Sequence, residues 1–214
     1  MRYLVVLSLF IFIGGCGSKE SSDKLTPPAT VGKAASTMPE GWQEVKAENI
    51  HMGLPKEWQV ADLTQGDFDK MMSSLKFGPG AEGLKGQIKQ MADSGMFKLF
   101  AFGPKMTKGF QENININATP VREANLEEGK TSILTQMKTV APDASAEVLK
   151  SPECILVTAT MDAQGPSGPI KYATRGYMFL KAGKGYTFTF SCSVDDRAAM
   201  AEFADKVAKT IAID

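Results

Sequence analysis

Apolar and polar positions alternate most strictly near the end of the chain. Over 185–194 every second residue is apolar and most residues between are Thr or Ser; the apolar set is Tyr186, Phe188, Phe190, Cys192 and Val194. Alternation of this kind places the two sets on opposite faces of a strand, so we expect Cys192 to face the core. Further apolar runs over 153–162 and 170–181 are joined by a Gly/Pro loop and by the short turn 182–184. Such short links predict an antiparallel three-strand meander.

Two segments near this meander have apolar residues at helical spacing. A helix beginning near Asp195 would carry four of them on one face: Met200, Phe203, Val207 and Ile211. A helix over 125–138 would carry Leu126, Ile133, Leu134 and Met137. Asn125 is followed three residues later by Glu128, an arrangement that resembles a capping box and favours a helix start at Asn125.

The preceding part of the chain predicts two pairs of strands with helices between them. Strands are expected over 42–46 and 49–54, and Pro55 ends the second because proline cannot donate to a sheet ladder. A second pair is expected over 96–102 and 109–117. Two apolar stripes between the pairs predict helices: Phe68, Met71, Met72 and Leu75 after a cap at Asp67, then Leu84, Ile88 and Met91 after Gly78-Pro79-Gly80.

The predicted strand over 109–117 has one strongly polar face. Its apolar side carries Phe110, Ile114 and Ile116, and its polar side carries Gln111, Asn113, Asn115 and Asn117. Alternation in antiparallel strands is typical of one buried and one wet face, so we expect the row of amides to be solvated. A row of amides could also recognise a glycan or a peptide, and this alternative stays open.

The chain starts with a single cation, Arg2, and an apolar run over 3–13 that is followed by Gly14, Gly15 and Cys16. This run is too short to span a bilayer, which takes roughly 20 residues. The stretch Ile13-Gly14-Gly15-Cys16 resembles the lipobox of bacterial lipoproteins at all of its positions. The resemblance implies cleavage before Cys16 and a diacylglycerol on its sulfur. Two or three acyl chains hold a protein firmly on a membrane, because each buried methylene contributes about 0.8 kcal/mol.

The domain plan follows from this resemblance and from composition. Residues 1–15 are interpreted as a signal peptide, and 16–40 as the lipidated Cys16 with a flexible tether, because 17–40 has almost no large apolar side chain. A tether of this length has a root-mean-square span of about 25–30 Å. The remainder, 41–214, is expected to form one globular domain.

Charge and cysteine content narrow the function classes. Without Arg2, 23 basic side chains remain against 24 acidic ones, and this balance argues against a nucleic-acid-binding surface. Apart from Cys16, the cysteines are Cys154 and Cys192. In a three-strand meander these two lie near opposite ends of the sheet, roughly 25–30 Å apart at about 3.3 Å per residue, too far for a disulfide. We therefore expect two unpaired thiols.

The order of elements from 41 to 213 resembles the PsbP-like family, whose bacterial members include envelope lipoproteins of the LpqN and DcrB kind. The similarity rests on that order, on the stretch LPKEW at the end of the second strand, and on the terminal meander and helix. It implies an α+β fold, an α/β/α sandwich with a mostly antiparallel sheet and helices on both faces. It also implies a binding or assembly module, since the family shares no catalytic residues that would carry over.

The sequence offers little catalytic or cofactor chemistry. His51 is the single histidine, which leaves neither a second imidazole for a usual metal site nor a further base for a hydrolase, and we interpret it as a surface or strand-end residue. The stretch 78–83 matches G-x-G-x-x-G, but a strand is not predicted before it. Methionines on apolar helix faces favour core packing over copper binding. Asp62, Asp67 and Asp69 lack calcium-loop spacing. Catalytic, cofactor and metal residues are therefore not assigned.

The leading hypothesis is a lipid-anchored, non-enzymatic protein of the cell envelope that binds a protein partner or supports an assembly. The alternative is a carrier of a small apolar ligand or lipid in a cavity between sheet and helix. A third option, an enzyme that uses carboxylates alone, ranks below both. Gly17 and Ser18 follow Cys16, and in a host with two membranes the lack of Asp directly after Cys16 resembles lipoproteins exported to the outer membrane, which implies its periplasmic side.

Overall fold

The computed structural model describes residues 38–64, 89, 93–122, 125–165 and 168–214. The predicted lipobox with Cys16, most of the predicted tether, the two helices expected around 67–75 and 84–91, and the glycine loop 78–83 lie outside these residues. In the described part of the chain, no helix is both long and apolar enough to cross a membrane.

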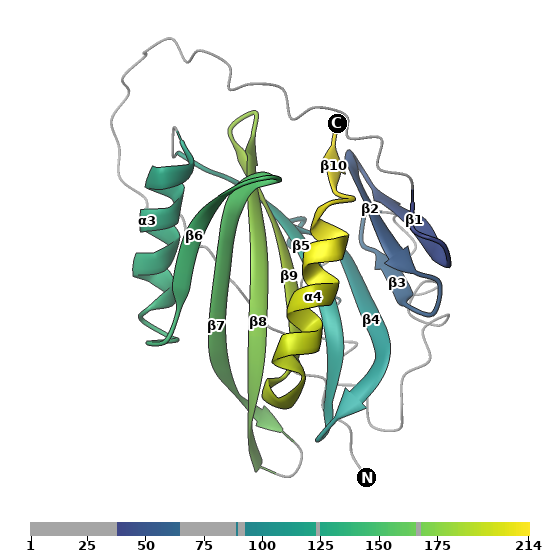
Figure 1. Cartoon of the computed structure of the whole chain (residues 1–214). Helices are drawn as coiled ribbons and strands as arrows, with labels where there is room; N and C mark the ends of the chain where they lie inside the picture. Colours follow the sequence, from purple (N-terminus) through teal and green to yellow (C-terminus); the bar gives the residue numbers. More distant parts are fainter. Residues whose placement is uncertain (1–37, 65–88, 90–92, 123–124, 166–167) are drawn as a thin grey trace.

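The main element is a seven-stranded sheet in the order β3-β4-β5-β9-β8-β7-β6, with every neighbouring pair antiparallel (Figure 1). Its strands are β3 Gln59–Asp62, β4 Phe97–Thr107, β5 Phe110–Pro120, β6 Ser145–Lys150, β7 Glu153–Gly165, β8 Gly168–Lys181 and β9 Lys184–Ser193. A smaller antiparallel sheet has the order β1-β2-β10, with β1 Trp42–Ala47, β2 Ile50–Pro55 and β10 Ala212–Ile213.

The predicted meander is confirmed as β7, β8 and β9. Its second turn is tight because Ala182 and Gly183 both have positive φ, 51° and 72°. Cys154 and Cys192 are both unpaired, and Cys192 is buried, as predicted; Cys154 is buried as well. Both strands pair with β8, where the partner of Cys192 is Ala173 and the partner of Ile155, the neighbour of Cys154, is Met178. The two thiols therefore lie at different levels along the strands of the sheet.

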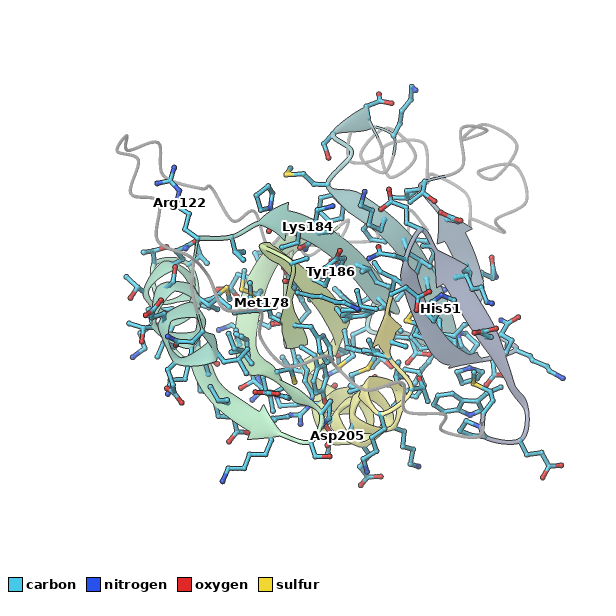
Figure 2. The ribbon with its side chains drawn as sticks, turned by 90° about the horizontal axis from the view of Figure 1, so that it is seen from above. His51, Arg122, Met178, Lys184, Tyr186 and Asp205 are labelled. Atoms are coloured by element: carbon cyan, nitrogen blue, oxygen red, sulfur yellow. The ribbon has the colours of Figure 1, made fainter. Side chains whose placement is uncertain are left out.

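Two longer helices pack on opposite faces of this sheet. Alternate residues of β7 divide between two cores: Ile155 and Val157 join the core of α3 Leu126–Met137, while Cys154 and Leu156 join the core of α4 Arg197–Ala208. Figure 2, a view from above, separates α3 from α4, which carries Asp205. The expected α+β class with a mostly antiparallel sheet is therefore confirmed. Each described helix covers part of one face.

The helix ends show which local predictions hold. The capping box is present, since the Glu128 amide donates to Asn125 Oδ1 at 3.0 Å and Asn125 Nδ2 donates to Glu128 Oε1 at 3.0 Å. The buried residues of α3 are Gly129, Ile133 and Met137; Leu126 and Leu134, predicted on the same face, are half-buried. The last helix is preceded by a 3-10 turn, η1 Val194–Asp196, so α4 starts later than predicted.

The expectation of a solvated amide row is wrong. Asn113, Asn115 and Asn117 are 0 %, 0 % and 2 % exposed. They lie on β5, a central strand, beside Thr187, Thr189 and Ser191 of β9 on one side and β4 on the other. Alternation in the sequence shows that two faces of a strand differ in polarity, but it does not show that the polar one is open to water.

Candidate functional site

A cavity of about 450 Å³ lies between the β7–β9 part of the sheet and the first half of α4. Its walls are formed by Asp143, Thr158, Ala159, Ala173, Thr174, Arg175, Cys192, Val194, Asp195, Arg197, Ala198, Met200 and Ala201. Small side chains face one another here: Ala173 on β8 is opposite a helix whose pocket side carries Ala198 and Ala201. The pocket is open to solvent on the side of Asp195, Arg197 and Ala198, which are exposed, and its volume lies within the range of small-molecule pockets.

One side of the pocket is closed by a chain of polar contacts. Asp143 accepts hydrogen bonds from the Thr160 amide at 3.1 Å and from the Thr160 hydroxyl at 2.5 Å. The same hydroxyl accepts a hydrogen bond from Arg197 Nη2. These bonds from Thr160 hold the pKa of Asp143 below its usual value, so the carboxylate is ionised at neutral pH. Asp143, on the loop before β6, is thereby fixed to β7, and Arg197 is drawn toward the same strand.

The other side is held by Arg175, Tyr177 and Asp205. Arg175 Nε donates to Tyr177 Oη at 2.6 Å, and Arg175 Nη2 donates to Asp205 Oδ1 at 2.6 Å. The Tyr177 hydroxyl also donates to Asp205 Oδ1. Burial and the bond to Asp205 raise the pKa of Tyr177, so its hydroxyl stays protonated. The network connects β8 to α4 and fixes the Arg175 side chain, which is 20 % exposed.

Cys192 is the one thiol in the pocket wall, and it is a poor nucleophile there. Burial raises the pKa of the Cys192 thiol to about 12, and the neighbouring carboxylate of Asp196 acts in the same direction. Only the thiolate attacks electrophiles or binds metals. Cys154, in the same core away from the pocket wall, also has its pKa raised by burial to about 12. Both cysteines therefore behave as core side chains.

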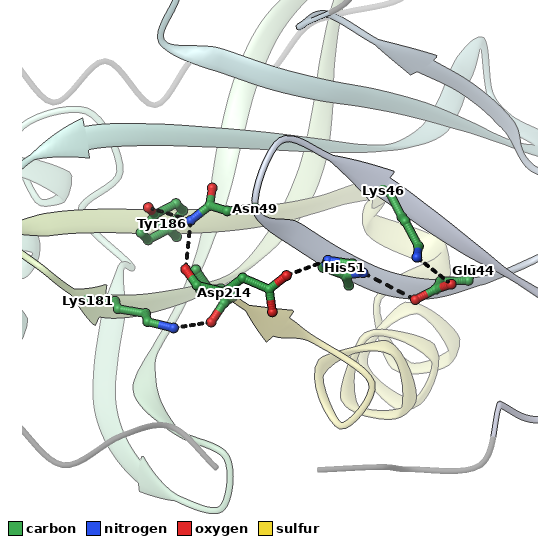
Figure 3. Close-up of polar contacts among 8 residues, drawn as sticks. Glu44, Lys46, Asn49, His51, Lys181, Tyr186 and Asp214 are labelled. Atoms are coloured by element: carbon green, nitrogen blue, oxygen red, sulfur yellow. Dashed lines mark hydrogen bonds and ion pairs between the residues drawn. The ribbon is translucent and has the colours of Figure 1, made fainter. Parts of the chain in front are cut away.

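His51 lies away from this pocket, on β2, in a polar cluster at the end of the small sheet (Figure 3). Its Nδ1 is 3.2 Å from Glu44 Oε1 and its Nε2 is 2.9 Å from Asp214 Oδ2. The hydrogen bond from His51 lowers the pKa of Glu44. Asn49 contributes further bonds, from its Nδ2 to Tyr186 Oη at 3.1 Å and to the Asp214 carbonyl at 3.2 Å.

This cluster connects β10 to β2 and does not resemble a catalytic site. The histidine lies near the start of β2, contacts two carboxylates and is not part of the pocket wall, so its position agrees with the predicted strand-end residue. In the residues that the structure describes, groups of three or more His, Cys, Asp or Glu that could hold a metal ion are absent.

The comparisons with known proteins add a likeness of fold. The sequence matches no known family model and no curated protein. Among solved structures it is similar to the cyanobacterial PsbP (CyanoP) of Synechocystis sp., with 13% identity and a TM-score of 0.47, over 86% of this chain and 99% of that one. It is also similar to LpqN of Mycobacterium tuberculosis, which is described as involved in cell envelope biogenesis (9% identity, TM-score 0.44, 80% and 90% covered). A third neighbour is Mog1p, a Ran-binding protein of Saccharomyces cerevisiae (7% identity, TM-score 0.48, 80% and 95% covered).

Two of these neighbours are of the PsbP and LpqN kinds that the element order resembles. With TM-scores below 0.5, the likeness carries no argument on ligand, partner or activity, and membership of the PsbP-like family stays a prediction.

The pocket residues were not among the sequence-based candidates. The clearest available sign was Arg175, a charged residue in the middle of a strand, flanked by Ala173 and Tyr177 on the same face. The predicted lipidation site, Cys16, lies outside the described residues, as do Asp67 and Asp69 of the aspartate cluster. Asp62, the described member, accepts hydrogen bonds from the Thr64 amide at 2.9 Å and the Thr64 hydroxyl at 2.6 Å, and so forms a local turn.

Proposed function

We propose that the chain is a non-catalytic binding protein of the cell envelope that holds a small, partly apolar molecule between its sheet and α4. The observation that carries this proposal is the cavity of about 450 Å³ lined by facing alanines. Pockets for small molecules are typically concave, mostly apolar and about 300–1,000 Å³ in volume. The geometry thus favours the carrier hypothesis over the protein-partner hypothesis that led the sequence analysis.

Binding rather than catalysis is supported by the state of the pocket side chains. The Cys192 thiol is protonated at neutral pH because its pKa lies at about 12. Asp143 is engaged by Thr160 and Asp195 by Lys108, at 2.5 Å between Oδ2 and Nζ. The pocket thiol thus lacks the depressed pKa that a cysteine nucleophile needs, and the ionised Asp143 is held by two hydrogen bonds from Thr160.

The proposal includes the cellular location inferred from the sequence. Residues 1–15 would be removed as a signal peptide, the Cys16 sulfur would carry the lipid, and 16–40 would tether a single domain, 41–214, outside the cytoplasm. It also includes the complete α/β/α sandwich, which is supported by α3 and α4 packing on opposite faces. Palmitate labelling of the wild type and of Cys16→Ser tests the anchor: label should enter the wild type alone.

Native mass spectrometry of the full-length protein purified from its own membranes tests the carrier function. We expect the wild type to carry an added small-molecule mass beyond the lipid on Cys16. Ala201→Phe, which places a ring in the pocket, should abolish the adduct. Ala199→Phe, on the exposed side of the same helix and outside the pocket wall, should retain it. A wild type without an adduct, or equal adducts in all three proteins, would contradict the carrier function.

A protein partner remains the second proposal, carried over from the sequence analysis. Cross-linking in intact cells followed by identification of the captured protein tests it. The two proposals are separated by one result: if the chain is a carrier, the small-molecule adduct persists in protein that is free of the cross-linked partner.

A further inference from the structure

We infer that the pocket between β7–β9 and α4 selects ligands that carry a carboxylate, held by Arg197 and Arg175 above an apolar floor. The inference rests on the proposed function and adds the chemical class of the ligand. Both arginines line the pocket, and they come from different elements, Arg197 from the first turn of α4 and Arg175 from the middle of β8.

The first argument is the number of hydrogen-bond donors. A guanidinium has five N–H groups in a fixed plane. Arg197 uses Nη2 toward Thr160, and Arg175 uses Nε and Nη2 toward Tyr177 and Asp205. Within the described part of the chain, Nη1 of each arginine makes no hydrogen bond. Two donor groups that line one cavity therefore remain available for a ligand.

The second argument is that the acidic side chains of the pocket are already engaged. Asp143 accepts from Thr160, and Asp195 forms an ion pair with Lys108. Asp205, beyond Arg175, accepts from both Arg175 and Tyr177. The carboxylates at the pocket thus already have partners, whereas Nη1 of each arginine has none among the described residues. This difference favours a ligand that brings acceptor oxygens.

The third argument is the orientation of α4, whose N-terminal half forms one pocket wall. Its N-cap residue, Asp196, makes no side-chain capping bond and instead pairs with Lys105 at 2.5 Å. The amides of the first turn lack a side-chain cap, and that of Arg197 donates to the Val194 carbonyl of η1. The helix dipole favours negative charge at this end, where Asp195 and Asp196 also lie. Together with the two arginines and the cavity, this end of the helix matches a carboxylate.

The apolar residues at the bottom of the pocket determine which chemistry the rest of the ligand can have. Ala173, Met200 and Ala201 present methyl and thioether groups, and Ala173 and Met200 are 4 % and 5 % exposed. A short apolar chain or ring attached to the carboxylate would cover this floor. A strongly polar body, such as a sugar, would leave hydroxyl groups without partners there.

Calorimetric titration of the full-length protein in lipid nanodiscs tests the inference with three probes of equal chain length: hexanoate, 1-hexanol and hexylammonium. The signal of Ala201→Phe is subtracted to remove partitioning into lipid. We expect hexanoate to bind at least about tenfold more tightly than either other probe, since charge-assisted hydrogen bonds to arginine are roughly twice as strong as neutral ones.

Variants of the full-length protein test whether Arg197 causes the preference for hexanoate. Arg197→Gln should lose most of the preference for hexanoate over 1-hexanol. Because it also removes the single bond to Thr160, the readout is the ratio of the two affinities measured in the same variant. Lys206→Gln, which removes a cation from the same helix outside the pocket wall, should behave as the wild type. Arg175 is unsuitable for this purpose because its substitution would also break the contacts with Tyr177 and Asp205.

Two results would overturn the inference, and they differ from failure of the proposed function. If 1-hexanol or hexylammonium binds the wild type as tightly as hexanoate, the pocket binds ligands without selecting carboxylates. If Arg197→Gln keeps the full preference, the selection has another origin and the inference is wrong. If none of the probes distinguishes the wild type from Ala201→Phe, the proposed carrier function itself fails.

Discussion

The buried hydroxyl of Thr189 offers a sharp stability test of the sheet interior. Thr189 lies on β9 opposite Asn115 of β5, and its side chain is 0 % exposed. In the part of the chain that the structure describes, its Oγ1 has no hydrogen-bond partner. Thr189→Val replaces this hydroxyl with a methyl group of nearly the same size, so it removes the unsatisfied polar atom without leaving a cavity.

The magnitude follows from the cost of an unsatisfied buried group. Leaving a donor or acceptor without a partner costs about 1–3 kcal/mol, so we expect Thr189→Val to raise the free energy of unfolding by about 1–3 kcal/mol. For a protein of this size, each 1 kcal/mol corresponds to roughly 2–4 °C in Tm. The matched control is Thr210→Val. Thr210 Oγ1 accepts from the Gly53 amide at 2.8 Å and donates to the Val207 carbonyl at 2.7 Å. Its loss should destabilise by a similar amount.

Urea unfolding followed by tryptophan fluorescence measures both variants against the wild type. The expected signs are opposite: the urea midpoint rises for Thr189→Val and falls for Thr210→Val, with unchanged m-values. If Thr189→Val is destabilised as much as Thr210→Val, the Thr189 hydroxyl has a partner in solution, such as a buried water. The argument that the Thr189 hydroxyl is unsatisfied and costly would then be refuted.

Three further predictions follow from the helix cap and the shifted groups. Asn125→Ala should lower the free energy of unfolding by about 1 kcal/mol, because the Glu128 amide loses its cap; thermal unfolding with Ser132→Ala as control measures this. Iodoacetamide at pH 8 should alkylate Cys192 on the order of 1,000-fold more slowly in the folded than in the unfolded protein, because folding raises the pKa of the thiol from 9.0 to about 12. Equal alkylation rates would contradict the burial of Cys192. Burial raises the pKa of Glu112 above its usual 4.5, so the folded state favours the protonated carboxyl group. The contribution of this proton to the free energy of unfolding is fully present below pH 4.5 and is lost as the pH rises through the folded pKa. Glu112→Gln keeps the acceptor for the Lys105 amide and should therefore be more stable than the wild type at pH 7 and equal to it at low pH.

Much of the fold could be predicted because its strongest patterns are local. The alternation in β9 and the tight turn at Ala182 and Gly183 gave the correct meander. The capping box at Asn125 gave the correct helix start. β3 and β10 were missed because they have only four and two residues, and β6 was missed because it has only exposed and half-buried positions.

The amide row on β5 shows where a local pattern stops being informative. The sequence separated the polar from the apolar residues of that strand correctly. Whether the polar side is covered depends on elements far away in the sequence, and here Asn113 and Asn117 are buried.

The pocket could not be predicted for a similar reason. It exists because Ala173 of β8 faces the small residues of α4, and in the sequence each of these alanines is an ordinary position of an amphipathic element. Arg175 was visible in the sequence as a charge in the middle of a predicted strand. Its partners Tyr177 and Asp205 become evident only when β8 and α4 are packed together.

The most direct test of the central claim is methyl NMR of the full-length protein with ¹³C-labelled methionine and alanine during titration with hexanoate. If the cavity between the sheet and α4 is the binding site, the methyl resonances of Met200 and Ala201 should shift and saturate together, while that of Ala199 on the exposed side of the helix stays unchanged. Unchanged Met200 and Ala201 resonances at saturating hexanoate, or equal shifts at Ala199, would contradict the account.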